Sequence, residues 1–349
     1  MTVKRLTWLV VALAAVGLVL AAVGCGGSDN KSSSSGDNAI KVGLVTDTGG
    51  VDDKGFNQFS IAGLDQAKDE LGVETRVYVS KTADDYQPNL TAASDDGNDL
   101  VIAVGFLLSP ATAATAEQYP DISYAGVDHF YGDPGSECEQ SGACLHPNTL
   151  GMNYPSQESG YEAGVVAALM TKSGTVSTVG GKKIPPVDNW IAGFQAAVKA
   201  TKPEVKVLNA YSQDFEDVAK CKEIALDQIA HGSDVIFQVA GKCGLGAIDG
   251  ACEKGKIAIG VDVDQSGVGD CVLVSALKPL QSSVFDVIKS FKDGTFKANR
   301  NVFFGVAQLP DAMLLTDFHG DVPQSVKDAV AAADKGLKDG SIKPPATVP

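Results

Sequence analysis

A short segment rich in carboxylates, 46–57, contains residue types that can bind a polar ligand. Asp47, Asp52 and Asp53 offer hydrogen-bond acceptors, and the amide of Asn57 adds two donors. Three carboxylates repel a phosphate, whereas a neutral polyhydroxylated or heterocyclic molecule can satisfy them. The segment therefore predicts a site for an uncharged small molecule.

This segment is expected to connect a buried strand to a helix. The apolar run 40–45 has strand character, and 63–72 has helical spacing. Ligands of open α/β sheets bind beyond the carboxyl ends of the strands, which is where such a connection lies. The alternative is an ordinary connection in which glycines make the turn and aspartates cap the helix. The segment lacks the Gly-Lys-Ser/Thr of a phosphate-binding loop and the Gly-x-Gly-x-x-Gly of a dinucleotide fingerprint.

The first residues have the pattern of an export signal. Lys4 and Arg5 precede an apolar run, and Cys25 follows a small residue. This pattern resembles a bacterial lipoprotein signal over residues 1–24, after which Cys25 is the lipidated first residue. An uncleaved membrane anchor is the alternative. The serine-rich stretch 25–38 predicts a flexible tether, so the remaining chain is expected at the extracytoplasmic face of the cell membrane, held there by its lipid.

The chain is acidic, with a formal net charge of −15 at pH 7. Lys4 and Arg5 lie in the signal, so the balance without them is −17. An acidic surface repels phosphate backbones, which excludes nucleic acid as a partner. The roughly 320 residues that follow the signal exceed what one hydrophobic core usually serves, so two domains are expected.

Cysteine usage predicts disulfides rather than a metal site. Seven cysteines leave six after the lipidated one, an even number that suits an oxidising compartment. A local bridge is expected in a patternless loop, between Cys138 and Cys144. The other four cysteines allow three pairings, of which we favour Cys221 with Cys243 and Cys252 with Cys271. Because no Cys-x-x-Cys pair occurs and the four histidines are scattered, no metal is expected.

Strand-like and helical segments alternate along the chain, which implies an α/β protein with parallel sheets covered by helices on both faces. The pattern restarts after a loop near residues 130–148, so we expect one sheet on each side of it. We assign 39–128 and about 262–298 to a first lobe, and about 149–261 and about 299–320 to a second. Residues 321–349, a C-terminal helix and tail, are not assigned to either lobe. In this assignment the strand at 150–153 opens the second lobe, 271–276 returns to the first, and 302–306 crosses again.

Six short motifs follow the tether in a fixed order: Asp52 to Gln58, Gly126 to Asp128, Trp190 to Phe194, Val239 to Gly246, Gly260 to Gln265 and Ser275 to Lys278. In this order they resemble the basic membrane protein family, the substrate-binding lipoproteins of ABC importers. The better-understood members bind purine nucleosides. The resemblance covers about residues 40 to 310 and implies a type I periplasmic-binding-protein fold: two Rossmann-like lobes joined by three crossovers, which close on the ligand by hinge motion.

The resemblance also implies roles for residues of the first motifs. Asn57 matches an asparagine that hydrogen-bonds the base, with Asp47 nearby on the same loop. Asp128 would address a base edge; its alternative role is to cap or turn the chain. Trp190 matches an aromatic residue that stacks on the base from the second lobe. Its alternative role is a core tryptophan packed with Phe194 at helical spacing.

Three further ligand residues follow from the later motifs. Gly241 would let the backbone approach the ligand, Asp262 would accept from ribose hydroxyls, and Lys278 would donate to them. An ion pair between Asp262 and Lys278 that stabilises closure is the alternative. One departure concerns Ile61, which stands where the family commonly has an aromatic residue; an apolar sandwich of Ile61 and Trp190 can still hold a base.

We therefore expect a monomeric binding protein of an ABC importer that captures a nucleoside, purine by resemblance, and delivers it to a permease. No cofactor and no catalytic residues are predicted, since no Ser/His/Asp or Cys/His set occurs. A sugar-binding protein or sensor of the same fold is the alternative. A nucleoside hydrolase is a remote one: the segment from Asp47 to Asp53 superficially resembles a calcium loop, but Val45 replaces its first aspartate and the spacing is one residue too long.

Overall fold

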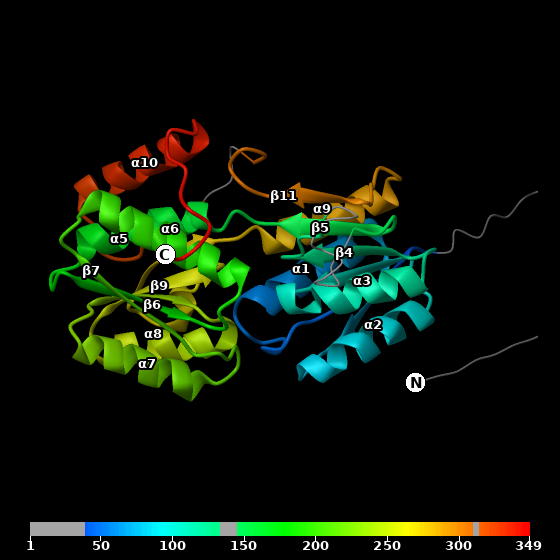
Figure 1. Cartoon of the computed structure of the whole chain (residues 1–349), viewed down its shortest axis with the longest axis horizontal. Helices are drawn as coiled ribbons and strands as arrows, with labels where there is room; N and C mark the ends of the chain where they lie inside the picture. The colour runs from blue at the N-terminus through cyan, green and yellow to red at the C-terminus, as the bar shows by residue number, and fades with distance from the viewer. Residues whose placement is uncertain (1–38, 133–144, 310–313) are drawn as a thin grey trace, which may run out of the picture. The chain divides into compact units, whose positions relative to one another are not determined.

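The computed structural model describes residues 39–132, 145–309 and 314–349, and these form two parallel β-sheets with helices on both faces of each. Within these residues no helix is both long and apolar enough to cross a membrane. We call each sheet with its helices a lobe (Figure 1).

The first lobe is built on a six-stranded sheet with the order β11-β5-β4-β3-β1-β2. All of its neighbouring strands pair in parallel. Its strands are β1 (Lys41–Val45), β2 (Glu74–Tyr78), β3 (Leu100–Val104), β4 (Ser123–Val127), β5 (Thr149–Asn153) and β11 (Arg300–Phe303). Its helices are α1 (Phe56–Leu71), α2 (Tyr86–Asp95), α3 (Ser109–Gln118) and α9 (Leu280–Lys292).

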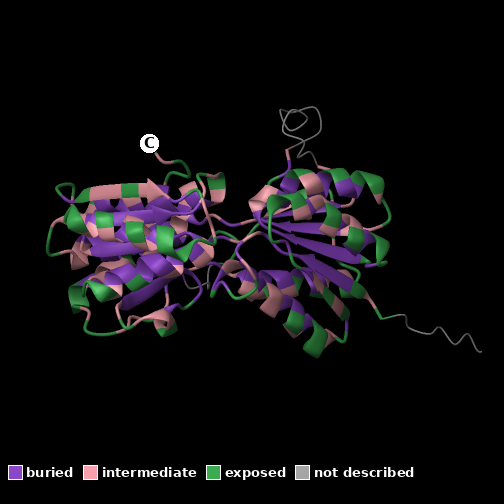
Figure 2. Ribbon diagram, turned by 90° about the horizontal axis from the view of Figure 1, so that it is seen from below, coloured by how far each residue is buried: buried purple, intermediate pink, exposed green. Residues whose placement is uncertain are grey.

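Alternation along the strands divides the first core into two layers. Leu100 and Ile102 of β3 pack in the layer covered by α1 and α9, whereas Val101 and Ala103 pack in the layer covered by α2 and α3. Successive side chains of a strand point to opposite faces, so an unbroken apolar run is required when both faces are covered. Figure 2 shows the buried strands at the centre of each sheet and exposed residues on the outer faces of the helices.

The second lobe repeats this plan on a five-stranded sheet with the order β10-β9-β8-β6-β7. Helices α5 and α6 cover one face, around Phe237 and Phe194, and α7 and α8 cover the other. Its strands are β6 (Thr175–Gly180), β7 (Lys206–Tyr211), β8 (Val235–Val239), β9 (Ile257–Asp262) and β10 (Val272–Leu277). Its helices are α5 (Gln157–Met170), α6 (Pro185–Thr201), α7 (Val218–Ala230), α8 (Gly244–Glu253) and α10 (Gln324–Lys338), and α10 packs on α5.

Three strands belong to the lobe opposite to the one expected from the sequence. The strand at 149–153 pairs with β4 in the first sheet, 272–277 pairs with β9 in the second, and 300–303 pairs with β5 in the first. The predicted lobe membership of these strands is therefore wrong. The irregular stretch before β5 suggested a change of lobe, but the chain adds one more strand to each sheet before it crosses. Periodicity reveals a strand but not the strand it pairs with.

Both lobes use the strand order 2-1-3-4-5, with β11 added at the edge of the first. The chain crosses from β5 to α5 and from β10 to α9, and after β11 it returns to the second lobe, where Leu315 bridges Ala276. In this order, ligand sites lie beyond the carboxyl ends of the strands, near the point where the chain reverses direction across the sheet.

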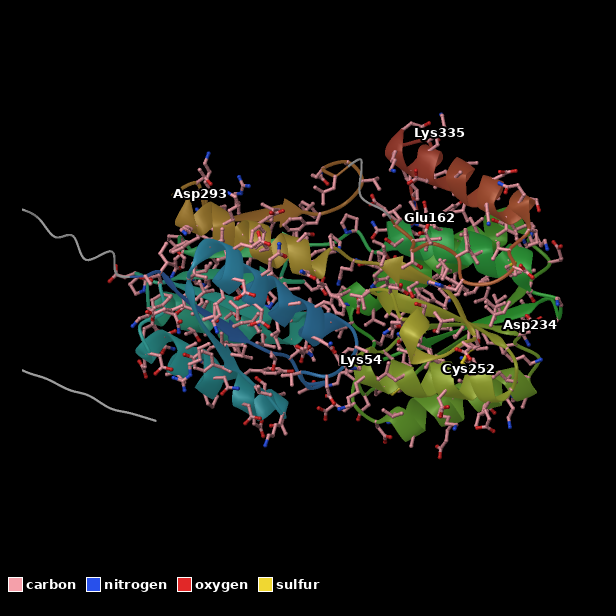
Figure 3. All side chains as sticks on the ribbon, turned by 180° about the vertical axis from the view of Figure 1, so that it is seen from behind. Lys54, Glu162, Asp234, Cys252, Asp293 and Lys335 are labelled. Carbon is pink, nitrogen blue, oxygen red and sulfur yellow. A yellow bond between two sulfur atoms is a disulfide. The ribbon has the colours of Figure 1, made fainter. Side chains whose placement is uncertain are left out.

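Two disulfides lie in the second lobe, Cys221–Cys243 and Cys252–Cys271, with Cα atoms 5.5 and 5.1 Å apart. Cys252 is marked in Figure 3. This confirms the predicted pairing of these four cysteines. The predicted bridge Cys138–Cys144, the predicted lipidation of Cys25, and the predicted signal and tether concern residues outside the described ones.

Candidate functional site

A cavity that is partly open to solvent lies at the carboxyl ends of both sheets. Loops after β1, β3 and β4 line it from the first lobe, and the start of α6 and the loops after β7, β8, β9 and β10 complete it. Small-molecule sites of α/β proteins lie at such a place. Its lining includes seven of the eight ligand residues expected from the sequence: Asp47, Asn57, Asp128, Trp190, Gly241, Asp262 and Lys278.

Asp47 and Asn57 are buried and bound to one another at the first-lobe wall. The backbone N–H of Asp47 donates to Oδ1 of Asn57 at 3.1 Å. Oδ1 of Asp47 accepts from the Tyr86 hydroxyl and from the backbone N–H of Thr48 at 2.6 Å. Burial raises the pKa of Asp47 to about 6, although these hydrogen bonds oppose the rise.

Asp53 also lines the cavity, but its carboxylate is occupied by the start of α1. It accepts from the backbone N–H groups of Gly55, Asn57 and Gln58 at 2.8 to 3.1 Å. The first N–H groups of a helix lack partners within the helix, and a carboxylate placed there satisfies them. The capping role considered for the loop aspartates therefore applies to Asp53, which also fixes where α1 begins.

Asp128 and Lys278 form a buried ion pair with each other. Lys278 Nζ donates to both carboxylate oxygens of Asp128, at 2.6 and 2.8 Å, and the two side chains are 3% and 7% exposed. Nζ also lies 5.0 and 4.9 Å from the ring centroids of Phe56 and Tyr154. The predicted alternative that Lys278 pairs with Asp262 is wrong, since the carboxylate of Asp128 occupies the cation.

Asp262 is a buried carboxylate on the cavity wall, and within the described residues no hydrogen bond to its side chain is found. Burial raises its pKa to about 7, with nearby Lys278 lowering it and the carboxylates of Asp128 and Asp53 raising it. Its backbone is left-handed, with φ of 68°, and Asp128 at the end of β4 has φ of 61°. Left-handed non-glycine residues of this kind concentrate at functional sites. Asp262 thus presents acceptors that a ligand can use.

Apolar and aromatic side chains form the remaining walls. Phe56 and Phe106 come from the first lobe, and Trp190 and Phe215 from the second. Trp190 is only 2% exposed and packs edge to face on Phe237, so it belongs to the core as well as to the cavity wall.

Ile61 does not line the cavity and packs instead in the core layer under α1 and α9. Its expected place beside the ligand is therefore wrong, and Phe56 is the aromatic residue of α1 that faces the cavity. Because α1 begins at Phe56, this residue lies five positions before Ile61, which is about 140° around a helix.

Gly105, which the sequence prediction missed, lets Asp47 reach the cavity wall. A Cβ atom on Gly105 would lie 2.5 Å from Oδ2 of Asp47, and its φ of 108° suits only glycine. Behind it, His129 is fully buried and its Nε2 lies 2.8 Å from the Gly105 carbonyl oxygen. Burial lowers the pKa of His129 to about 4, in keeping with a packing role.

Three side chains of the second lobe bind the 46–57 loop, which contributes residues to the cavity wall, and we call them the rim clamp: Glu216, Lys242 and Gln265. The backbone N–H of Gly49 donates to Glu216 at 3.1 Å, and Lys242 Nζ donates to Asp52 at 2.8 Å. Gln265 donates to the carbonyl oxygen of Lys54 at 3.1 Å. The disulfide Cys221–Cys243 ties the start of α7 to the turn that carries Lys242. The 46–57 loop of the first lobe is thus held by side chains of the second.

The site combines hydrogen-bonding groups with apolar walls. Across residues 39–132, 145–309 and 314–349, no cluster of three or more His, Cys, Asp or Glu side chains is arranged to hold a metal ion. The cavity carboxylates outnumber its single lysine, so they favour a ligand that brings hydrogen-bond donors. This arrangement can bind and orient a small molecule.

A family model described as ABC transporter substrate-binding protein PnrA-like, also called Bmp, matches residues 40–327. The chain belongs to this family. The family places it among transporter binding proteins rather than enzymes.

Two relatives of similar length support the assignment of the chain to the PnrA-like family. It is 31% identical to the ABC transporter nucleoside-binding protein BmpA of Lactococcus lactis, over 96% of this chain and 98% of that protein. It is 32% identical to the CD4+ T-cell-stimulating antigen of Listeria innocua, over 95% of each chain.

Solved structures show the same fold for the PnrA-like chain. A solute-binding protein of an ABC transporter system from Aeropyrum pernix superposes with a TM-score of 0.77 at 22% identity, covering 87% of this chain and 92% of that chain. A dimeric Lac repressor superposes with a TM-score of 0.57 at 12% identity, covering 80% and 98%. The type I periplasmic-binding-protein fold expected from the sequence is therefore confirmed.

Proposed function

We propose that this ABC transporter substrate-binding protein captures a nucleoside, in particular a purine nucleoside, and delivers it to a permease. The carrying observation is the buried carboxylate of Asp262, which faces the cavity and has no hydrogen-bond partner among the described side chains. Desolvating a carboxylate without partners is costly, so a ligand that supplies two hydroxyl donors recovers that cost. A ribose diol has this property.

The apolar walls of the cavity support a flat heterocycle as the other part of the ligand. Trp190 and Phe215 from the second lobe and Phe56 from the first offer ring faces or edges to a base. Asp47 and Asn57 offer an acceptor and an amide to a base edge. Asp128 and Lys278 neutralise each other, and the remaining Nζ hydrogen of Lys278 is available to a ribose oxygen.

Closure follows from where these groups originate. Asn57 and Asp47 belong to the first lobe, whereas Trp190 and Asp262 belong to the second. A ligand that contacts both sets binds the closed arrangement more tightly than an open one, so it shifts the population toward closure. The permease would then receive the closed, loaded form.

The proposal includes a membrane anchor at Cys25 in place of a membrane-spanning segment. Lipidation at this cysteine would hold the protein at the membrane near the permease, and residues 26–38 would act as the tether. Expression of the full chain with labelled fatty acid tests this: label is expected on the parent protein and absent from Cys25→Ser.

The ligand class is tested by thermal shift of the purified protein with nucleosides, free bases, ribose and other sugars, followed by calorimetry on each hit. A ligand that binds only the folded state raises its stability with concentration. The expected result is a shift with adenosine, guanosine or inosine and none with ribose. A shift with sugars alone would reject the nucleoside and leave a sugar-binding protein of this fold.

A further inference from the structure

Tyr86 lies behind the cavity wall, at the first residue of α2, and does not line the cavity itself. It is 4% exposed and packs in the core layer under α2 and α3. Its hydroxyl nevertheless donates to Oδ1 of Asp47, a cavity residue from another element. Burial, together with the neighbouring Asp47 carboxylate, raises the pKa of Tyr86, so the hydroxyl keeps its proton and remains a donor.

The two oxygens of Asp47 therefore have different environments. Oδ1 accepts three hydrogen bonds, from Tyr86, from the Thr48 backbone N–H at 2.6 Å and from the Thr48 hydroxyl at 3.2 Å. A carboxylate oxygen has about two lone-pair sites, so Oδ1 has no capacity left for a ligand. Among the described residues no hydrogen bond to Oδ2 is found, and a Cβ atom on Gly105 would lie 2.5 Å from Oδ2, so the space beside this oxygen requires glycine at that position.

We propose that Tyr86 is a positioning residue that fixes Asp47 with Oδ2 as the acceptor offered to the ligand, so that the site selects a ligand edge carrying an N–H or O–H donor. This inference rests on the proposed nucleoside function, in which that edge belongs to the base. An edge that presents only acceptors would place its lone pairs against those of Oδ2. Such an unpaired contact costs more than a missing hydrogen bond.

The charged groups around Asp47 are consistent with this assignment. Lys182 lowers the pKa of Asp47 from a distance, and the hydrogen bond from Tyr86 lowers it further, against the effect of burial. Three other carboxylates line the cavity: Asp53 is occupied by the α1 backbone, Asp128 is occupied by Lys278, and Asp262 has no hydrogen-bond partner among the described residues. Removal of the Tyr86 hydroxyl should therefore raise the pKa of Asp47.

The first test needs no ligand. Carbon NMR of labelled aspartates, with Asp47→Asn to assign the signal, follows the titration of Asp47 in the full chain and in Tyr86→Phe. The expected midpoint is about 6 in the parent. An upward shift of about half a unit or more is expected in Tyr86→Phe. Thr48→Ala, which removes another donor to the same oxygen, should shift it in the same direction. An unchanged midpoint in both variants overturns the positioning role.

The second test measures binding by calorimetry with inosine and with 1-methylinosine, which lacks the ring N–H donor, and with adenosine and its N,N-dimethyl derivative. Loss of one hydrogen bond to a charged group predicts about tenfold weaker binding of the donor-bearing nucleosides to Tyr86→Phe. A smaller change is expected for the methylated ones. In the Asp47→Asn background, Tyr86→Phe should cost nothing more. Equal losses in both backgrounds would show that Tyr86 does not act through Asp47.

Tyr124→Phe is the matched control. Tyr124 lies in the same core layer as Tyr86, is fully buried, and shares a hydrogen bond with the Ser94 hydroxyl away from the cavity. It should lose a similar amount of stability with no change in affinity or in the titration of Asp47. A parent protein that binds no nucleoside would reject the proposed function, and the titration would still decide the role of Tyr86.

Discussion

Asp262 should make ligand binding depend on pH in the neutral range. Its pKa is raised to about 7 by burial, and donors of a ligand favour its ionised form. Protonation as the pH falls removes an acceptor, so nucleoside affinity should be full above pH 8 and weaken through pH 7 toward 6. One unit below the pKa about a tenth of the carboxyl is ionised, which predicts about tenfold weaker binding.

Calorimetry between pH 5.5 and 8.5 on the parent and on Asp262→Asn checks this expectation. The variant should bind weakly throughout and lack the step near pH 7. A dideoxynucleoside, which has no diol, is the matched control ligand and should lose little affinity in the variant. If the ribonucleoside and the dideoxynucleoside lose the same affinity in the variant, Asp262 does not bind the ribose hydroxyls.

At the scale of single residues, the sequence predicted the acceptors and donors of the cavity better than its walls. Asp47, Asn57 and Asp262 follow strands or begin a helix, and those positions meet at the carboxyl ends of the sheets. Ile61 was wrongly included because it was assigned from the family's aromatic position, whereas its side chain packs in the core layer under α1 and α9. Phe56, which the same reasoning did not accept as a replacement, faces the cavity from the first position of α1.

At the scale of elements, α1 should depend on Asp53 for its first turn. Asp53→Ala leaves three backbone N–H groups without their acceptor, and loss of a capping side chain costs about 1–2 kcal/mol. The free energy of unfolding from urea titration should fall by that amount. Asp52→Ala is the control: Asp52 is exposed and pairs only with Lys242, so its loss should change stability little. Equal stability losses would contradict the capping role.

Glu162 should make the packing of α10 on α5 sensitive to pH. It is buried, with Oε1 lacking a partner among the described residues, on the side of α5 near α10, and Figure 3 marks its position. Burial raises its pKa to about 8, Asp334 of α10 raises it too, and Lys338 of α10 lowers it. Because its pKa in the folded protein lies above the ordinary value of 4.5, its stabilising contribution is full below pH 4.5 and is lost as the pH rises toward 8.

Glu162→Gln should therefore raise the free energy of unfolding above pH 8, by about 1–3 kcal/mol, and give no gain at pH 4.5. Urea titrations at pH 4.5, 6.5 and 9 measure this. Glu223→Gln on α7, where the glutamate is exposed, is the control and should be neutral throughout. A gain that does not change with pH would contradict the burial of a titrating carboxyl.

Strands and helices themselves were largely predictable, because burial of both faces requires the unbroken apolar run of β3, and burial of one face gives α6 its apolar spacing of 3.6 residues. The lobe to which β5, β10 and β11 belong could not be predicted from the sequence. Their pairing partners are distant in sequence, and apolar strands of this composition fit either sheet.

At the scale of the whole molecule, the rim clamp should slow the release of ligand. Lys242→Ala removes the ion pair with Asp52, which is worth up to about 1 kcal/mol for a partly exposed pair. Stopped-flow measurement should show dissociation about two- to fivefold faster at low salt, with the difference shrinking at high salt.

Lys222→Ala is the control, since Lys222 pairs with Asp249 and Glu253 inside the second lobe. It should leave the dissociation rate unchanged. The exchange Asp52→Lys with Lys242→Asp should restore the slow rate. If the double exchange releases ligand as fast as the single variants do, the ion pair between Lys242 and Asp52 does not slow dissociation.

The disulfide Cys221–Cys243 should make the strength of the rim clamp depend on the compartment in which the protein was produced. It joins the start of α7 to the turn after β8. Glu216 lies just before α7, and Lys242 lies in that turn. Thiols stay reduced in a bacterial cytosol, and the bridge forms only after the chain meets an oxidising environment. Batches of one sequence, purified from the two compartments, would then release ligand at different rates, and the oxidation state of these cysteines has to be assayed before any affinity is compared.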